Sequence, residues 1–200
     1  KKKKNYKILK ALVDIGKAHE VRLVYKTNFT QLSYKQLNVL DLWPEFKDVS
    51  VGASLDAMGP RSELVRNGTV WADVEHNREQ MIKRCPGVDF YVSATLSVFN
   101  HLHVVDFYND WIAKGFITHQ DWNMNVVQDP VHYRADILPQ HMKDNVTQLY
   151  EKHITEIEPK DHLGRATNGF KSAIKFINGT DNTKLIPKFQ KFVHLFFFFF

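Results

Sequence analysis

The sequence predicts a protein of the α/β class, and three features of its 200 residues lead to this prediction. Short apolar runs of strand length alternate with longer segments in which apolar residues recur at helical spacing. Each strand and the helix that follows it together cover about 30 to 40 residues, a length that suits parallel strands joined by right-handed crossovers. Beyond residue 139 the strands stop and only helical periodicity remains.

The first part of the chain is expected to contain two helices and two strands. We expect a helix at residues 6–17, because its apolar residues share one stripe, and a strand at 21–25. Ser33 can cap a second helix, which Pro44 would end. The second strand is expected at residues 49–55.

The remaining elements continue the alternation and then give way to helices. After a loop that contains Gly59 and Pro60, we expect helix 71–84, strand 88–95, helix 106–114, strand 122–127 and helices at 140–155, 168–178 and 184–194. No strand is followed by a Gly-x-Gly-x-x-Gly or Walker Gly-Lys-Ser/Thr sequence, so the phosphate-binding signatures of dinucleotide and triphosphate folds are missing. Periodicity leaves open whether the strands form part of a βα barrel or an open parallel sheet.

Composition limits the classes of function. The formal charge is +5, but residues 1–4 are all lysine, and without them 23 basic residues face 22 acidic ones. Between its two ends the sequence contains no Lys/Arg cluster of the kind that indicates nucleic-acid binding. With no signal peptide and no apolar run long enough to span a membrane, we expect a cytoplasmic protein without a membrane partner. The single cysteine, Cys85, cannot form an internal disulfide or supply a complete set of cluster thiolates.

Polar side chains collect where the expected strands end. In parallel βα architectures, ligands bind at the carboxyl ends of the strands, where the loops converge. The candidates at these ends are Asn28, Ser54, Asp56, Thr95, Ser97 and Asn125. A hydroxyl and a carboxylate two residues apart, as in Ser54-Leu-Asp56, suit the vicinal hydroxyls of a ribose. The alternative for each of these residues is a helix cap or a turn.

Other polar groups do not define a site. His101 and His103 have no nearby Cys, Asp or Glu set that would complete a metal centre. Ser62 and Ser97 lack a Gly-x-Ser-x-Gly elbow and an identifiable base. The sequence therefore assigns no metal ligand and no catalytic residue.

The block from Ser54 to Trp71, with Ser-Leu-Asp at its start and Arg-x-Gly-x-x-Trp at its end, resembles the middle of a radical S-adenosylmethionine (radical SAM) enzyme. The similarity is to the bacterial and phage proteins with a twitch or SPASM type C-terminal extension. Residues 25–30, 89–100 and 121–125 support the resemblance in the same order along the chain. It covers about residues 6–190.

This resemblance implies a partial, TIM-like (β/α)6 barrel that holds S-adenosylmethionine (SAM) and a 4Fe-4S cluster. In the family, the reduced cluster cleaves SAM, and the resulting 5′-deoxyadenosyl radical abstracts hydrogen from a peptide or small-molecule substrate. A flavodoxin- or ferredoxin-like protein would donate the electron. By the resemblance, Ser54 and Asp56 contact the SAM ribose and Arg66 pairs with the SAM carboxylate. Asn28, Thr95, Ser97 and Asn125 would line the same cavity.

The chain departs from the family at two motifs that the chemistry needs. The Cys-x-x-x-Cys-x-x-Cys loop after the first strand and the Gly-Gly-Glu-Pro segment after the second do not occur. We therefore expect about strands three to six of the barrel at residues 5–139, followed by the start of a helical extension at 140–195. Such a fragment of a longer enzyme would be inactive alone.

The homopolymer runs at residues 1–4 and 196–200 are interpreted as read-through at an incomplete gene boundary. An alternative of a different class is a cluster-free α/β scaffold that binds a nucleotide or a protein partner without catalysis.

Overall fold

The computed structural model describes residues 2–199 of the chain, with side chains described from residue 5 to residue 194. Lys1 and Phe200 lie outside the described residues, as do the side chains of the rest of both homopolymer runs. The chain divides into two compact units, Lys1–Val92 and Ser93–Phe200, which we call the N-terminal and C-terminal units. This division falls inside a strand, whereas the sequence places the boundary between barrel and extension at residue 139.

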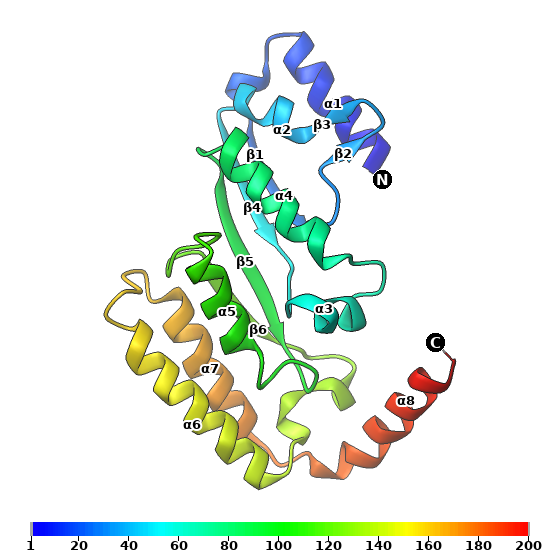
Figure 1. Cartoon of the computed structure of the whole chain (residues 1–200), viewed down its shortest axis with the longest axis vertical. Helices are drawn as coiled ribbons and strands as arrows, with labels where there is room; N and C mark the ends of the chain where they lie inside the picture. The colour runs from blue at the N-terminus through cyan, green and yellow to red at the C-terminus, as the bar shows by residue number, and fades with distance from the viewer. Residues whose placement is uncertain (1, 200) are drawn as a thin grey trace. The chain divides into compact units, whose positions relative to one another are not determined.

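A four-stranded sheet has the order β1 (Arg22–Thr27), β4 (Asp48–Ala53), β5 (Asp89–Leu96) and β6 (Trp122–Val126), as Figure 1 shows. β4 pairs in parallel with β1 on one side and with β5 on the other. The α/β class and the parallel sheet are therefore confirmed. Closure into a barrel stays a prediction.

The helices of the N-terminal unit are α1 (Lys2–Asp14), α2 (Val39–Leu42), α3 (Gly59–Val65) and α4 (Trp71–Arg84). Side chains of α4 and of the residues after α2 pack on one face of the strands. Tyr25, Val51 and Phe90 stand side by side in the register of β1, β4 and β5. The Tyr25 ring packs 5.5 Å from Trp43, just after α2, and the guanidinium of Arg78 on α4 lies 3.9 Å from the centre of the Phe90 ring.

The helix expected from Ser33 is wrong. A short hairpin of β2 (Ser33–Tyr34) and β3 (Leu37–Asn38) stands in its place, and only α2 follows. The reason is local, because the Asn38 side chain accepts a hydrogen bond from the Leu40 amide and so caps a helix that starts five residues later than Ser33 would allow. Lys35 adopts φ 55° in the two-residue turn between the strands.

The loop expected around Gly59 is also wrong, since these residues begin α3. Pro60 lies in the first turn of α3, where proline's missing amide costs no helical hydrogen bond. The helix expected at residues 6–17 ends earlier, at Asp14, and Gly16 adopts φ 68° just beyond it.

The C-terminal unit contains β6 and the helices α5 (Val104–Ala113), α6 (Gln140–Ile157), α7 (Arg165–Gly179) and α8 (Ile186–Phe199). An aromatic core joins β6 to α5 and α7. α6 and α7 lie side by side, and α7 also packs on β6 (Figure 1). Tyr108 of α5 contacts Trp122 of β6 and Phe170 of α7, with ring centres 5.2 and 6.2 Å apart. These three fully buried rings join the three elements.

No helix among the described residues has both the length and the apolar character that a membrane crossing requires.

Candidate functional site

Two of the expected site residues, Asn28 and Ser54, lie at the carboxyl edge of the N-terminal unit. β1 ends at Thr27 and β4 at Ala53, which are partners in the register. The Ser54 amide donates to the Thr27 carbonyl at 2.7 Å, so the pairing continues one residue past β4. Asn28 is exposed and Ser54 is half-buried. The structure therefore brings these two side chains to the same edge, as the sequence predicts.

Ser54 and Asp56 do not continue the alternation of a strand. β4 ends before them, and the Leu55 amide turns back to the Ala53 carbonyl at 3.0 Å. Asp56 becomes buried, with 8% of its surface exposed. The argument that a strand places both side chains on one face therefore does not apply here.

Asp56 and Arg66 form the central ion pair of the Ser54–Trp71 block. Oδ2 of Asp56 accepts hydrogen bonds from Nε of Arg66 at 2.8 Å and from Nη2 at 2.7 Å. The Arg66 side chain is 31% exposed. Arg66 directly follows α3, and its backbone amide bonds to the Ser62 carbonyl. The two charged residues that the resemblance assigns to SAM thus contact each other.

Further hydrogen bonds and a glycine turn hold the Ser54–Trp71 block together. The Trp71 amide, at the start of α4, donates to Oε1 of Glu63 on α3 at 2.8 Å. Gly68 adopts φ 83° in the turn between the two helices, a conformation that favours glycine. The segment from Ser54 to Trp71 is therefore a continuous strand end, helix, turn and helix start, which holds the ion pair next to β4.

In the C-terminal unit, Ser97 is used by the turn that follows β5. Oδ1 of Asn100 accepts from the Ser97 amide at 2.8 Å and from the Ser97 hydroxyl at 3.3 Å, while its Nδ2 donates to the Thr95 carbonyl at 3.0 Å. The Phe99 amide also donates to the Ser97 hydroxyl, at 3.2 Å. Ser97 is buried and acts as a turn residue, which is the alternative that the sequence left open. Thr95 is half-buried.

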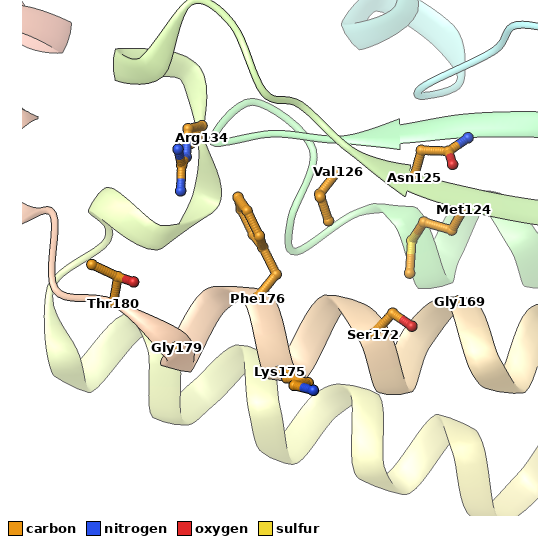
Figure 2. Close-up of a pocket in the computed structure, with 10 residues that line it drawn as sticks. All are labelled: Met124, Asn125, Val126, Arg134, Gly169, Ser172, Lys175, Phe176, Gly179 and Thr180. Atoms are coloured by element: carbon orange, nitrogen blue, oxygen red, sulfur yellow. The ribbon is translucent and has the colours of Figure 1, made fainter.

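Asn125 borders a pocket beside β6, shown in Figure 2. The pocket has a volume of about 520 Å³, within the usual range for small-molecule sites. It is lined by residues of β6, of α7 and of the loops that follow them: Met124, Asn125, Val126, Arg134, Gly169, Ser172, Lys175, Phe176, Gly179 and Thr180. Met124 points toward α7, whereas the exposed Asn125 points to the other side of the strand (Figure 2).

The charges of this pocket come from Arg134 and Lys175. Arg134 donates through Nη2 to Asp136, and its guanidinium lies 4.9 Å from the centre of the Phe176 ring. Asp136 is fully buried and also accepts from Nδ2 of Asn182 at 2.9 Å. Because Asp136 neutralises Arg134, the exposed Lys175 supplies the net positive charge. The pocket suits a small apolar molecule with a polar or anionic group.

Sequence reasoning identified Asn125 but missed the rest of this pocket. Arg134 and Phe176 are far apart in the chain, and no motif connects them. A weak signal exists in α7, where Gly169, Ser172 and Gly179 place small residues along one stripe, and Gly169 lies close against Met124 of the strand.

The histidines near β5 and β6 are structural. Nδ1 of His101 lies 2.9 Å from the Val98 carbonyl, and the half-buried His103 lies 3.6 Å from Asp106 on the next helical turn. His153 is buried against Tyr108, and burial lowers the pKa of its imidazole to about 4. Tyr108 bonds to Nδ1 of His119 at 2.7 Å, and burial also lowers the pKa of His119.

No metal centre is formed by the described residues, which contain no group of three or more His, Cys, Asp or Glu side chains placed to hold an ion. The thiol of Cys85 is buried and donates to the Leu40 carbonyl at 3.3 Å. Burial raises the pKa of this thiol, so it stays protonated at neutral pH. The residues of this chain therefore do not fit an iron–sulfur cluster, which needs several thiolates.

The structure defines an α/β protein with a parallel sheet, a polar strand edge and a helical C-terminal region. Comparison with protein-family models, with curated proteins and with solved structures gave no match.

Proposed function

We propose that this chain supplies part of the SAM-binding barrel of a radical SAM enzyme. The proposal rests on the resemblance of residues 54–71 and on one observation, the Asp56–Arg66 pair directly after a parallel strand. Ligands of parallel α/β proteins bind beside this end of the strands. In this proposal the cluster needs thiolates from outside these 200 residues. The reaction on a peptide or small molecule and the contact with an electron donor depend on that cluster.

The geometry of Arg66 is suited to a carboxylate ligand. Asp56 occupies the side of the guanidinium that carries Nε and one proton of Nη2. A guanidinium has five N–H groups, so Nη1 and the second proton of Nη2 remain as a fork at the far end. Such a fork binds a carboxylate through two parallel hydrogen bonds. In this proposal Asp56 orients Arg66, and the fork receives the carboxylate of SAM.

Ser54 and Asn28 supply polar groups for the remainder of the ligand. Both lie at the edge where β1 and β4 end, and both have accessible side chains. A hydroxyl and an amide at this edge can donate to and accept from the ribose hydroxyls. Asp56, already bonded to Arg66, is a positioning residue in this scheme and not a direct ribose contact.

The test is calorimetric titration of the full chain with three ligands: SAM, S-adenosylhomocysteine and 5′-methylthioadenosine. The last keeps the nucleoside but lacks the amino-acid carboxylate. Arg66→Lys retains a charge opposite Asp56 and removes the fork, so SAM and S-adenosylhomocysteine should bind about tenfold more weakly. Binding of 5′-methylthioadenosine should not change, and Ser54→Ala should weaken all three ligands.

Arg61→Lys is the matched control, because Arg61 is a half-buried arginine on α3, the helix that Arg66 directly follows. It should leave every affinity unchanged. Absence of saturable SAM binding by the unmutated chain would refute the proposal, as would equal SAM affinity of the unmutated chain and Arg66→Lys.

A second candidate is a cluster-free α/β scaffold that binds a nucleotide or a protein partner. The buried, hydrogen-bonded Cys85 favours it, because this thiol is held by the fold and not presented to a ligand. This candidate predicts that AMP binds as tightly as SAM and that Arg66→Lys has no effect on either. The same titrations therefore separate the two functions.

A further inference from the structure

The face of β1, β4 and β5 opposite the helices carries a polar pair above a glycine. Lys26, Gly52 and Tyr91 are neighbours in the register of the three strands. Nζ of Lys26 donates to the Tyr91 hydroxyl at 2.6 Å and lies 4.5 Å from the centre of the tyrosine ring. Val24, two residues earlier on the same face of β1, is 73% exposed. This face of the sheet is therefore accessible. The Lys26–Tyr91 pair spans it from β1 to β5, over β4.

Gly52 makes this contact possible. A Cβ at position 52 would lie 2.8 Å from both Cζ and the hydroxyl of Tyr91 and 2.9 Å from Nζ of Lys26. Any side chain would thus separate the two groups. Glycine inside a strand weakens the strand, and it often marks a place where a ligand approaches the backbone closely.

The acidic side chains nearest to Lys26 in the sheet form bonds with other residues. In the next row of the register, Ser50 donates to Oδ2 of Asp89 at 2.8 Å, and farther along the sheet Arg22 pairs with Asp48 at 2.8 Å. Within the described part of the chain Lys26 forms no ion pair with an acidic side chain. Its charge is therefore available to a ligand.

The donors of this pair converge. An ammonium group has three N–H donors, and the bond to Tyr91 uses one of them. The Tyr91 oxygen accepts that bond, so its own proton is left to donate. Two adjacent groups that both donate, one of them positively charged, match an oxygen of a carboxylate or a phosphate.

We propose that Lys26 and Tyr91, brought together above Gly52, bind the carboxylate or phosphate group of a small substrate. The role as a substrate anchor rests on the proposed function. Ser54 lies two residues beyond Gly52, directly after the end of β4, about 7 Å toward the carboxyl edge. A substrate held at Lys26 would therefore lie next to a ligand at that edge.

The experiment uses the full chain and two probes, sodium acetate and inorganic phosphate, titrated at constant ionic strength and followed by NMR of the labelled protein. Saturable shifts centred on β1, β4 and β5 are expected for at least one probe. Acetate alone indicates a carboxylate substrate, and phosphate alone indicates a phosphate substrate. Lys26→Met and Tyr91→Phe should each weaken binding, by about tenfold for the lysine.

Gly52→Ala is the decisive variant, because it retains both ligand-binding groups. The added methyl contacts only the ends of flexible side chains, so the protein should fold normally while the pair separates and probe binding is lost. Lys47→Met removes an equal, exposed charge elsewhere in the N-terminal unit and should have no effect.

Three results would overturn the site: no saturable binding by the unmutated chain, unchanged binding in Gly52→Ala and Lys26→Met, or an equal loss in Lys47→Met. SAM affinity should be the same in Lys26→Met as in the unmutated chain. Failure of the SAM proposal appears instead in the Arg66 titrations, so the two proposals can fail separately.

Discussion

Gly169 of α7 lies directly against Met124 of β6. A Cβ at position 169 would come 3.1 Å from Cβ of Met124 and 3.4 Å from its backbone nitrogen. Helix and strand therefore approach each other more closely than two ordinary side chains would allow. This contact fixes the distance between α7 and β6 and so one wall of the pocket in Figure 2.

Gly169→Ala should destabilise the C-terminal unit by about 1 to 3 kcal/mol, because the backbone of β6 has to move to admit the methyl group. Gly179→Ala is the control in the same helix, since nothing lies within 4 Å of a Cβ at that position. It should be neutral or stabilise by up to about 1 kcal/mol. Urea unfolding of the two variants measures both effects, and equal stabilities would contradict the close contact.

The Asp56–Arg66 pair should also be measurable in the absence of any ligand. Asp56→Ala and Arg66→Ala should each cost about 1 to 3 kcal/mol, because each leaves a partly buried charge without its partner. The double variant should cost less than the sum of the two. A double-mutant cycle by urea unfolding gives the coupling energy, and additive effects would show that the pair contributes no energy of its own.

Asp136 is expected to be one of the most sensitive positions of the C-terminal unit. It is fully buried, and it bonds both Arg134 and Asn182. Asp136→Ala should cost about 3 kcal/mol, since it removes the carboxylate from a buried pair, and Asn182→Ala about 1 kcal/mol. Asp144→Ala, on the exposed side of α6, should change stability by less than about 0.5 kcal/mol. Thermal and urea unfolding of the three variants measure this ranking of destabilisation. A larger loss of stability in Asp144→Ala than in Asp136→Ala would contradict it.

His153 should make stability depend on pH. Burial lowers its pKa to about 4 in the folded protein, against about 6.5 in an unfolded chain. Between these values the unfolded state binds more protons, so stability is complete above about pH 6.5 and falls as the pH decreases toward 4. The loss amounts to about 3 kcal/mol.

His153→Phe should remove most of this pH dependence, because the ring packs against Tyr108 and Phe170 and has no hydrogen-bond partner among the described residues. His19→Gln, at an exposed position, should keep it. Urea unfolding between pH 7 and pH 4 provides the comparison. If the free energy of unfolding of His153→Phe changed with pH as it does in the unmutated chain, the pH dependence would come from other groups.

Most of the regular elements follow from local pattern. The helix at residues 71–84 is predicted with the bounds that α4 has, because apolar spacing begins at Trp71 and Pro86 lies just after its end. The four strands of the main sheet are found within one or two residues of their expected positions. These signals are local, and burial of both strand faces or of one helix face strengthens them.

The errors arise where several local signals compete. Ser33 and Asn38 can both cap a helix, and only the fold decides that the segment between them pairs as a hairpin. Ser97 can line a site or hold a turn; its bonds with Asn100 show the turn, and its place in a site stays a prediction.

The candidate sites show the same limit. The sequence places Ser54 and Asn28 at one strand edge, but it cannot show that Asp56 turns inward to Arg66. Nor can it show that Gly52 lies between Lys26 and Tyr91, since this depends on the register of three strands that are distant in the chain.

The position of β4 between β1 and β5 has a consequence for how the N-terminal unit opens. Both edges of β4 are hydrogen-bonded, whereas no strand of the described residues lies beside the outer edge of β1. Amide protons of β4 should therefore exchange with deuterium most slowly, and those on the outer edge of β1 should exchange early. In such a sheet the contact between Lys26 and Gly52 would be lost before the one between Gly52 and Tyr91, so the proposed site at Lys26 and Tyr91 would open from its lysine side.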